Sequence, residues 1–377
     1  MGSDCGRRFS VRGQRGGLGR EEQSYRAGVA APPVSGRALV AGMARRMLAA
    51  MPSLPDPRRI SASRRRTPAP TGPAVVVLGD LVVDVVMAPD RDMVRGTDVT
   101  GRVMLRQGGS AASTARWLGR IGARSSLICA IGRDAPGRAL VAAATGDKVT
   151  VRAVRVAGAR TGRIGVLVEP GGERSFVTER GAALRLRPED LRPDWFDGAD
   201  ALHLPAYSLL DQPLGLAGMA AAKIAHEKGV LVSVDLSSSG PLLAKGRQTA
   251  LSRILSAAPD LLFATKDESR ALVGAKHEER LLDLAPIAVV KRGRKGATIL
   301  ARDGRARLRF EVATQPLNAE DTTGAGDAFD AGFLAGWLEA RRKGLPLATA
   351  LQRGAVLGNR TAYRHLSNPP GELVLGS

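Results

Sequence analysis

The residues best suited to catalysis lie in the stretch DTTGAGDAFDAGFLAGWL, which spans residues 321–338. Phe329, Phe333 and Trp337 recur at four-residue intervals, which predicts a helix packed on an apolar core. The first N–H groups of a helix have no intrahelical acceptor and bind anions, and Gly324 and Gly326 leave them accessible because glycine has no Cβ atom. The stretch therefore predicts a phosphate site at a helix N-terminus.

Asp327 falls in the first turn of this expected helix. A carboxylate in that position can cap the helix and interact favourably with its dipole. In the same position it would also lie beside a bound phosphoryl group, where it could remove a proton from an attacking hydroxyl. Taken alone, Asp327 fits capping better, and only its surroundings can favour catalysis.

Strand-like and helix-like stretches alternate from residue 73 onward, and these elements must position the phosphate site. The near-continuous β-branched run at 73–87 predicts a strand buried on both faces of a sheet, and the apolar spacing at 108–122 predicts a helix. The alternation is typical of right-handed βαβ units, and it predicts an α/β fold with a mainly parallel sheet and helices on both faces. Further strands are expected at 125–132, 201–204, 230–235, 260–264, 288–291 and 297–300, and further helices at 214–228 and 248–256.

Residues 161–181 break this pattern. They form two alternating runs joined at Gly171-Gly172, which predicts a hairpin and therefore antiparallel structure. Ligands of an open α/β sheet bind beyond the carboxyl ends of its strands, and a hairpin projecting there would act as a lid. We therefore expect a small β lid built from segments at about 86–107 and 150–181.

The N-terminal 72 residues differ in composition from the rest of the chain. They contain 14 arginines and no lysine against four acidic residues, and so carry +10 of the formal net charge of +20. Their Gly, Pro, Ser and Ala content and lack of periodicity predict a disordered basic extension over 1–72 and a folded domain over 73–377. The extension could be a transit peptide, a tail for anionic partners, or a segment without function, as a start codon assigned too early would produce; the last is favoured.

The composition excludes several classes of protein. The chain has 377 residues, of which 44% are hydrophobic, and no apolar run reaches the roughly 18 residues needed to span a membrane. Cys5 and Cys129 cannot build a disulfide framework, and the four histidines show no zinc-binding spacing. The positive charge suggests nucleic acid, but aromatic residues make up only 3% and offer no stacking platform. We therefore expect a protein of the reducing cytoplasm, and the composition disfavours nucleic acid as its partner.

The stretch DTTGAGDAFDAGF resembles the C-terminal signature of the PfkB family of carbohydrate kinases. Residues 108–137 resemble the N-terminal signature of that family, and VVKRGRKGATI at 289–299 resembles its nucleotide-proximal strand and turn. The resemblance covers 73–377 and implies a ribokinase-like, three-layer αβα domain with a β lid. It also implies phosphorylation of a hydroxymethyl group on a sugar or sugar-like substrate, with ATP and Mg²⁺. The implied catalytic base is Asp327, and the implied anion hole consists of the amides of Gly324, Ala325 and Gly326.

The resemblance also implies residues on the sugar side of the site. Asp84 matches a hydroxyl-binding aspartate at the end of the first strand, and Asp80 is a second candidate, although either could simply belong to a strand-end turn. Ser113 stands where the family often has Asn, and Val82 stands where ribokinases have Asn. Both changes remove an amide side chain that could contact the sugar, and they argue against ribose itself as the substrate. Gly108 and Gly109 match the paired glycines that let the substrate lie against the backbone.

On the nucleotide side, residues 259–272 resemble a segment that usually carries Asn-x-x-Glu and organises magnesium through water. Thr265 replaces the Asn, while Glu268 is retained and would hold the metal indirectly. The chain has no Walker A sequence, so the phosphates must be held by the glycine-rich helix start. Three residues match the K-x-G-x-x-G turn of the family, namely Lys291, Gly293 and Gly296, although a lysine at a strand end is often only a solvated charge. Asn359 lies where the C-terminal helices of the family form the adenine pocket.

Three alternatives stay open. A nucleoside kinase of the adenosine or pseudouridine type is the first, because one scaffold can serve several functions. A nucleic-acid-binding protein is the second, and a sugar-binding protein without turnover, suggested by Ser113 and Thr265, is the third. The resemblance adds a monovalent cation such as K⁺ and a homodimer formed through the lid as further candidates.

Overall fold

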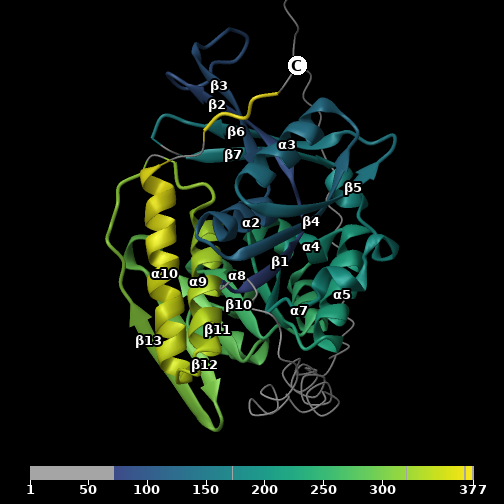
Figure 1. Ribbon diagram of the computed structural model, residues 1–377. Helices are drawn as coiled ribbons and strands as arrows, with labels where there is room; N and C mark the ends of the chain where they lie inside the picture. Colours follow the sequence, from purple (N-terminus) through teal and green to yellow (C-terminus); the bar gives the residue numbers. More distant parts are fainter. Residues whose placement is uncertain (1–71, 172, 320, 369–370, 376–377) are drawn as a thin grey trace, which may run out of the picture. The chain divides into compact units, whose positions relative to one another are not determined.

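The computed structural model describes residues 72–171, 173–319, 321–368 and 371–375 (Figure 1). The predicted N-terminal extension falls outside these residues, apart from Gly72. Along the described part of the chain, strands and helices alternate as the sequence predicts.

The larger of two sheets has nine strands in the order β13-β12-β11-β10-β9-β8-β1-β4-β5. Neighbouring strands are parallel, except that β12 runs antiparallel to both β11 and β13. The chain changes direction across the sheet at β1, and open α/β sheets bind ligands beyond the carboxyl ends of the strands at such a point. The strands are β1 (Ala74–Leu78), β4 (Arg124–Gly132), β5 (Val149–Val156), β8 (Ala201–Pro205), β9 (Leu231–Asp235), β10 (Leu261–Thr265), β11 (Ile287–Lys291), β12 (Ala297–Asp303) and β13 (Ala306–Val312).

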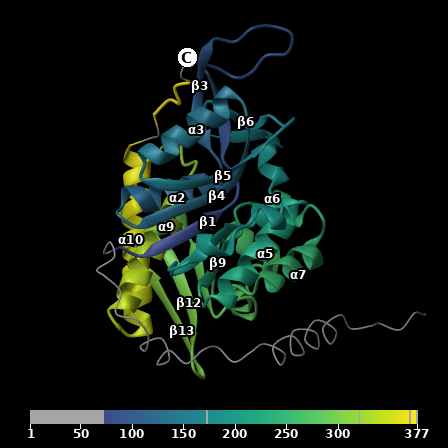
Figure 2. The same ribbon diagram turned by 45° about the vertical axis from the view of Figure 1, so that its right-hand side comes forward.

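Helices cover both faces of this sheet (Figures 1 and 2). In β1, Val75 and Val77 pack with α2, α3, α9 and α10 on one face, while Val76 and Leu78 pack with α4 to α8 on the other. Burial on both faces accounts for the β-branched run, and the layering confirms the predicted αβα architecture. The helices are α2 (Ser110–Arg120), α3 (Ala135–Gly146), α4 (Tyr207–Leu210), α5 (Leu214–Glu227), α6 (Ser239–Leu243), α7 (Arg247–Ala257), α8 (Lys266–Val273), α9 (Ala325–Arg342) and α10 (Leu347–Ser367).

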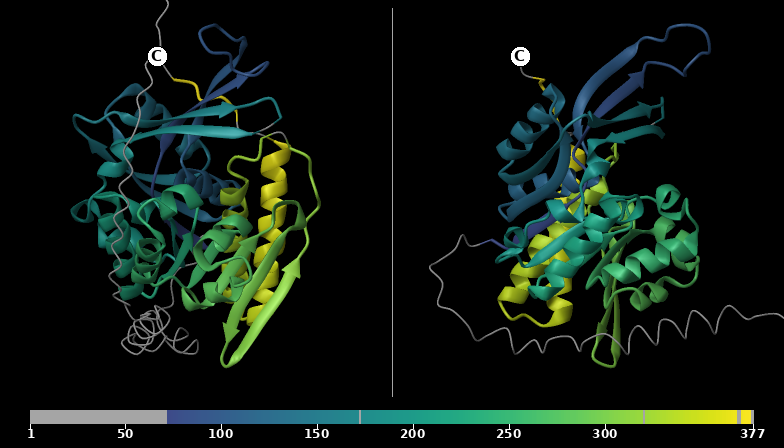
Figure 3. Two further views of the ribbon diagram at one scale, coloured as in Figure 1. Left: turned by 180° about the vertical axis from the view of Figure 1, so that it is seen from behind. Right: turned by 90° about the vertical axis from the view of Figure 1, so that its right-hand side faces the viewer.

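A second sheet has four strands in the order β3-β2-β6-β7 and lies at one end of the larger sheet (Figure 3). The predicted hairpin is confirmed as β6 (Thr161–Val168) and β7 (Arg174–Gly181), which pair antiparallel. The other two strands are β2 (Val82–Pro89) and β3 (Gly101–Gly108). The prediction that 150–181 belongs to the lid is wrong for the first part of this segment, because β5 lies at the edge of the larger sheet beside β4.

The run at 73–87, predicted as one strand, is divided between the two sheets. β1 ends at Leu78, and β2 begins at Val82 in the small sheet. The break falls at Gly79, where a Cβ atom would lie 2.6 Å from Ser208 Oγ and 2.8 Å from the Ala111 Cβ atom. Asp84 therefore lies within β2, and the prediction that it ends the first strand is wrong; Asp80 is the aspartate that follows β1.

Short 3₁₀ helices complete the connections: η2 (Ala182–Arg185), η3 (Pro188–Asp190), η4 (Pro193–Phe196), η5 (Glu278–Asp283) and η6 (Gly293–Lys295). None of the helices that the structure describes has both the length and the apolar character required to cross a membrane.

Candidate active site

A cavity of about 900 Å³ lies where the carboxyl ends of the central strands face the small sheet. Its floor includes Asp80 after β1 and the last residues of three other strands: Asp235 of β9, Thr265 of β10 and Lys291 of β11. The N-terminus of α9 and the first turn of α2 also line it. The fold thus gathers in one cavity residues that lie far apart in the sequence, at the place where a sheet of this type binds ligands.

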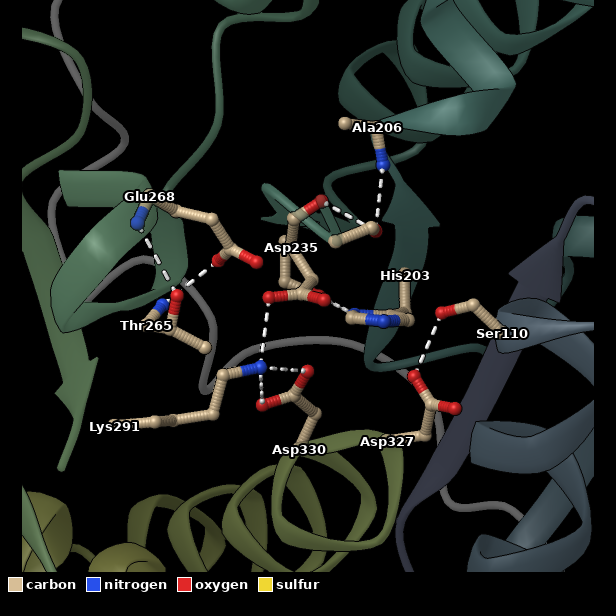
Figure 4. A network of polar contacts seen from close by, with 11 residues as sticks. Ser110, His203, Ala206, Asp235, Thr265, Glu268, Lys291, Asp327 and Asp330 are labelled. Atoms are coloured by element: carbon tan, nitrogen blue, oxygen red, sulfur yellow. Dashed lines mark hydrogen bonds and ion pairs between the residues drawn. The ribbon is translucent and has the colours of Figure 1, made fainter. Parts of the chain in front are cut away.

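Asp327 lies in the first turn of α9 and faces this cavity. Its Oδ1 atom accepts a 2.7 Å hydrogen bond from Ser110 Oγ, the first residue of α2 (Figure 4). The residue at the N-cap position is Gly324, which has no side chain, and among the described residues Ser110 is the hydrogen-bond partner of the Asp327 carboxylate. This geometry favours a carboxylate that serves the cavity over one that caps the helix.

The surroundings of Asp327 change its acidity. Together they raise the pKa of Asp327 from 3.8 to about 7: burial is the largest cause, and the negative charges of Asp235 and Asp80 act in the same direction. The hydrogen bond from Ser110 and the charge of Lys291 act in the opposite direction and lower the pKa. A carboxyl group with a pKa near neutrality is suited to general base catalysis at physiological pH.

The predicted anion hole is formed by the turn that precedes α9. Gly324 has φ = +79°, a left-handed conformation that glycine adopts without strain. The Ala325 N–H donates to the Thr322 carbonyl at 3.2 Å, so this amide is already paired. Within the described part of the chain, the N–H groups of Gly324 and Gly326 have no acceptor. Two of the three predicted amides are therefore available to an anion.

Lys291 is buried at the end of β11, so it is not merely a solvated charge at a strand end. Its side chain is only 10% exposed, and its Nζ atom donates to Asp235 Oδ1 at 2.8 Å and to both carboxylate oxygens of Asp330 at 3.1 and 3.2 Å (Figure 4). Burial lowers the pKa of Lys291, but the carboxylates of Asp235 and Asp330 together raise it above its ordinary value, so the ammonium stays charged. A Cβ atom at Gly326 would lie 3.3 Å from the Lys291 Nζ atom, so the ammonium group lies beside the predicted anion hole.

Thr265 and Glu268 form a capping box at the start of α8. Thr265 Oγ1 accepts from the Glu268 N–H at 3.2 Å, and Glu268 Oε2 accepts from the Thr265 N–H at 2.8 Å. Both residues line the cavity. Burial raises the pKa of Glu268, with Asp235 adding to the effect. The Thr that replaces Asn at this position thus has a structural role in the helix, and one oxygen of Glu268 remains for other partners.

Asp84 projects into the cavity from β2. Its Oδ1 atom is buried and has no hydrogen-bond partner among the described residues. The pKa of Asp84 is raised to about 7, mainly by burial and further by the charge of Asp80, while Arg106 acts in the opposite direction. A Cβ atom at Gly108 would lie 1.9 Å from Asp84 Oδ1, so Gly108 makes room for this carboxylate. Such an unpaired polar atom is a candidate to bind a substrate hydroxyl.

Asp80 is buried and paired with the small sheet. Its Oδ2 atom accepts from Arg180 Nη1 of β7 at 2.8 Å, and the Arg180 guanidinium also stacks over the Tyr207 ring, 4.0 Å from its centroid. Gly109 has φ = +99°, and a Cβ atom there would lie 2.4 Å from the Asp80 carbonyl oxygen. Asp80 thus joins the carboxyl end of β1 to the small sheet, and Gly109 allows α2 to begin close to it.

Three predicted nucleotide residues do not line the cavity. Gly293 and Gly296 shape the turn between β11 and β12, with φ of +55° and +90°. The Asn359 amide donates to the carbonyl oxygens of Val312 and Ala313 at 3.2 and 3.1 Å, which ties α10 to the end of β13. Ser113, by contrast, lines the cavity beside Gly324, where a Cβ atom would lie 3.3 Å from Ser113 Oγ.

Sequence patterns missed several residues of the site. Asp321, the first residue of the DTTGAGD stretch, accepts from Arg106 Nη1 of β3 and Arg174 Nη1 of β7, each at 2.9 Å. Arg174 also donates to the hydroxyl groups of Thr322 and Thr323. The small sheet is thereby bonded to the segment that leads into α9. The sequence patterns do not indicate Ser110 either, although it directly follows the paired glycines Gly108 and Gly109.

Comparison with known proteins settles the family. The model of the pfkB family carbohydrate kinases matches residues 73–370. The chain belongs to this family. A fructokinase of Klebsiella pneumoniae is 31% identical to this pfkB-family kinase over 272 residues, which are 69% of this chain and 83% of the relative. A cytidine kinase of Thermococcus kodakarensis is 27% identical over 286 residues, 74% of this chain and 92% of the relative.

The fold agrees with solved structures of related kinases. The adenosine kinase of Sinorhizobium meliloti superposes on this pfkB-family kinase with a TM-score of 0.68 at 26% identity, covering 80% of this chain and 97% of that chain. The predictions of a PfkB-type carbohydrate kinase and of a ribokinase-like α/β fold are confirmed. The protein is a transferase that acts on small molecules.

Proposed function

We propose that this kinase transfers the γ-phosphoryl group of ATP to a hydroxymethyl group of a sugar or sugar-like substrate, with Asp327 as the general base. The observation that carries the proposal is the position of Asp327: it faces the cavity from the first turn of α9, beside two amides without an acceptor among the described residues, and has a pKa of about 7. The base and the anion site therefore line the same cavity, as phosphoryl transfer requires.

The reaction follows from these groups. The Asp327 carboxylate accepts the proton of the substrate hydroxyl, whose oxygen forms a bond to the γ-phosphorus while the bond to the bridging oxygen of ADP breaks. The Gly324 and Gly326 N–H groups and the positive end of the α9 dipole stabilise the charge on the transferred group. Ser110 holds the carboxylate through Oδ1, which leaves Oδ2 to receive the proton. ADP and the phosphorylated substrate are then released.

Mg²⁺ fits the carboxylates of this site as an indirectly bound ion. Among the described residues no group of three or more acidic, His or Cys side chains could enclose a metal. Mg²⁺ usually keeps several waters and is held by one or two carboxylates together with the phosphates of the substrate. Glu268 and Asp235 line the cavity and would hold the ion through water. When bound, Mg²⁺ would neutralise charge on the phosphates.

The remaining assignments are proposals on the same basis. Asp84 binds a substrate hydroxyl through its unpaired Oδ1, and Gly108, Gly109 and Ser113 shape the same side of the cavity. Thr265 and Lys291 lie on the nucleotide side, where Lys291 lies beside Gly326 of the anion hole. Gly293, Gly296 and Asn359 act on the nucleotide only through the turns and helices they shape.

A nucleoside kinase is the second candidate, favoured by one feature of the cavity. The face of the small sheet that lines it carries apolar side chains from three strands: Val86, Ile164, Val166 and Phe176. Sugar hydroxyls need polar partners, whereas the faces of a nucleobase pack on apolar and aromatic side chains. Relatives named as cytidine kinase and adenosine kinase agree with this alternative.

Three further proposals concern partners and location. We propose that the small sheet serves as a lid and that its outer face, with Met87, Val103 and Val177 exposed, pairs two copies into a homodimer. Size-exclusion chromatography with light scattering tests the oligomeric state.

Activation by a monovalent cation such as K⁺ is also proposed, and it is tested by replacing K⁺ with Na⁺ in the assay. Cytoplasmic localisation stays a prediction.

The experiment that tests the function is an ADP-release screen across pentoses, hexoses, keto-deoxy sugars, phosphosugars and nucleosides, with protein that begins near Pro68. We expect turnover with one of these classes, and turnover of the same compound at least about a hundredfold slower with the Asp327→Asn protein. Turnover of nucleosides alone would select the second candidate. Binding of a sugar without ADP release from the intact protein would contradict kinase activity.

A further inference from the structure

His365 connects two parts of the active site. It lies near the end of α10, is only 5% exposed, and its Nδ1 atom accepts a 3.0 Å hydrogen bond from Trp117 Nε1 of α2. Its Nε2 atom lies 2.6 Å from the carbonyl oxygen of Thr323. The rings of Trp117 and His365 also meet edge to face, with centroids 5.7 Å apart. The imidazole therefore bridges α2 and the segment that enters α9.

The two contacts determine the protonation state of this imidazole. The indole N–H of Trp117 can only donate, so Nδ1 must carry a lone pair, and the Thr323 carbonyl can only accept, so Nε2 must carry the proton. Protonation of Nδ1 would set two N–H groups against each other. Burial lowers the pKa of His365, the charges of Arg120 and Arg116 lower it further, and Asp321 and the Thr323 carbonyl oppose them. The ring is therefore neutral, with one defined tautomer.

The Thr323 carbonyl belongs to the peptide unit that supplies the Gly324 N–H. In a planar trans peptide the C=O and N–H bonds point in opposite directions, so holding the carbonyl also fixes the direction of the N–H. Gly324, at φ = +79°, has the freedom to rotate this unit. His365 also packs against the glycine itself, since a Cβ atom there would lie 3.2 Å from its Cε1 atom. No other side chain among the described residues donates to this carbonyl.

We propose that His365, oriented by Trp117, is a positioning residue for phosphoryl transfer: it holds the Thr323–Gly324 peptide so that the Gly324 N–H is directed at the transferred phosphoryl group. This inference rests on the proposed kinase function and adds to it a residue 38 positions beyond Asp327 that no motif of the sequence contains. Because the amide is needed most in the transition state, the effect falls on kcat more than on substrate binding.

Two matched substitutions test the contact. In His365→Gln the side-chain amide can place its NH₂ group near the former Nε2 and still donate to Thr323, whereas the shorter His365→Asn retains a group near Nδ1 and loses that donor. We expect the Asn variant to lower kcat at least tenfold and the Gln variant to stay within about threefold of the parent, since removal of one oxyanion donor typically costs about 10²–10³ in kcat. KM for ATP and for the acceptor should change by less than about threefold in both.

NMR spectra test the tautomer of His365 independently of turnover, in the parent protein and in a third variant. The chain has only four histidines, so long-range ¹H–¹⁵N spectra can follow each ring. His365 should show a protonated Nε2 and an unprotonated Nδ1, and should not titrate near its ordinary pKa. Trp117→Phe keeps an aromatic ring but removes the donor, and His365 should then titrate at higher pH than in the parent protein.

The outcomes separate the inference from the function it rests on. If the parent protein phosphorylates a substrate and the Asn and Gln variants have equal kcat at equal melting temperature, His365 does not position the anion hole. A proton on Nδ1 of the parent protein would overturn the geometry in the same way. If the parent protein turns over none of the acceptors in the screen, the kinase function fails, and this inference falls with it whatever the spectra show.

Discussion

Ser110 Oγ donates a 2.7 Å hydrogen bond to Oδ1 of Asp327, although the two residues lie 217 positions apart. Ser110 is the first residue of α2 and Asp327 lies in the first turn of α9, so two helices begin against each other at the floor of the cavity. The bond holds one carboxylate oxygen and lowers the pKa of Asp327 against the effect of burial. Ser110 therefore tunes the proposed base as well as positioning it.

Removing the Ser110 hydroxyl should shift the pH profile. With a pKa of about 7, Asp327 becomes protonated as the pH falls below neutrality, so kcat/KM of the parent enzyme should decline on the acid side with an apparent pKa near 7. In Ser110→Ala the hydrogen bond that lowers the pKa is lost, so the acid limb should move to higher pH. Ser110→Thr keeps a hydroxyl and should restore the profile. An acid limb at the same pH in all three proteins would show that Ser110 does not act on the base.

Asp84→Ala should weaken acceptor binding. The substitution leaves a substrate hydroxyl unpaired in a buried place, which costs roughly 1–3 kcal/mol, or about 5- to 150-fold in KM for the acceptor. KM for ATP should change little, and Asp84→Asn, which keeps an acceptor oxygen, should have a smaller effect. Steady-state kinetics with both substrates varied provide the measurement. If the two KM values rise together, Asp84 supports the fold and does not recognise the acceptor.

Lys291→Met should destabilise the fold strongly, because it leaves the carboxylates of Asp235 and Asp330 buried without their cation. Breaking a buried ion pair by removing one partner costs about 3–5 kcal/mol in the free energy of unfolding. Asp330→Asn added to Lys291→Met should recover part of the loss. Lys295→Met, at an exposed position four residues later, is the control and should change the stability little. Urea unfolding that finds equal, small losses for both lysines would refute the role of the buried ammonium.

The local parts of the site could be predicted from the sequence. The start of α9, its apolar face and its glycines are determined by residues within a few turns of one another, and all the strands expected from residue 125 onward are present. Alternating and β-branched runs indicate which residues are buried, so the layers could be predicted from them. The division of 73–87 between two sheets could not be predicted, because it depends on the close approach of Gly79 to Ser208, a residue far along the chain.

The relationships across the site could not be predicted. Ser110, His365 and Asp330 act through side-chain contacts with residues of other elements, and no periodicity or spacing in the sequence indicates such contacts. Lys291 was recognised through its motif, yet its burial depends on β9 and α9 meeting beside β11. Family signatures identify the residues next to the substrates, whereas the residues that orient them emerge only from the packing.

Asp327→Asn should raise the melting temperature at high pH, whereas the loss of a helix cap would lower it. The folded-state pKa of about 7 lies above the value of 3.8 for a free carboxyl, so the folded parent binds more protons and loses stability as the pH rises from about 4 to 7. Asn removes this penalty, so its melting temperature should exceed that of the parent at pH 8, with the difference shrinking as the pH falls toward 4. Were Asp327 a cap, the Asn variant would melt at or below the parent temperature at pH 8.

The central claim is that Asp327 is the general base, and the kcat of Asp327→Asn tests it most directly. Asn keeps the shape and the acceptor for Ser110 but cannot take up a proton, so kcat should fall by roughly 10²–10⁴-fold. ATP affinity, measured by calorimetry on the folded variant, should be nearly preserved because the Gly324 and Gly326 amides are unchanged. A kcat within threefold of the parent value would contradict the mechanism.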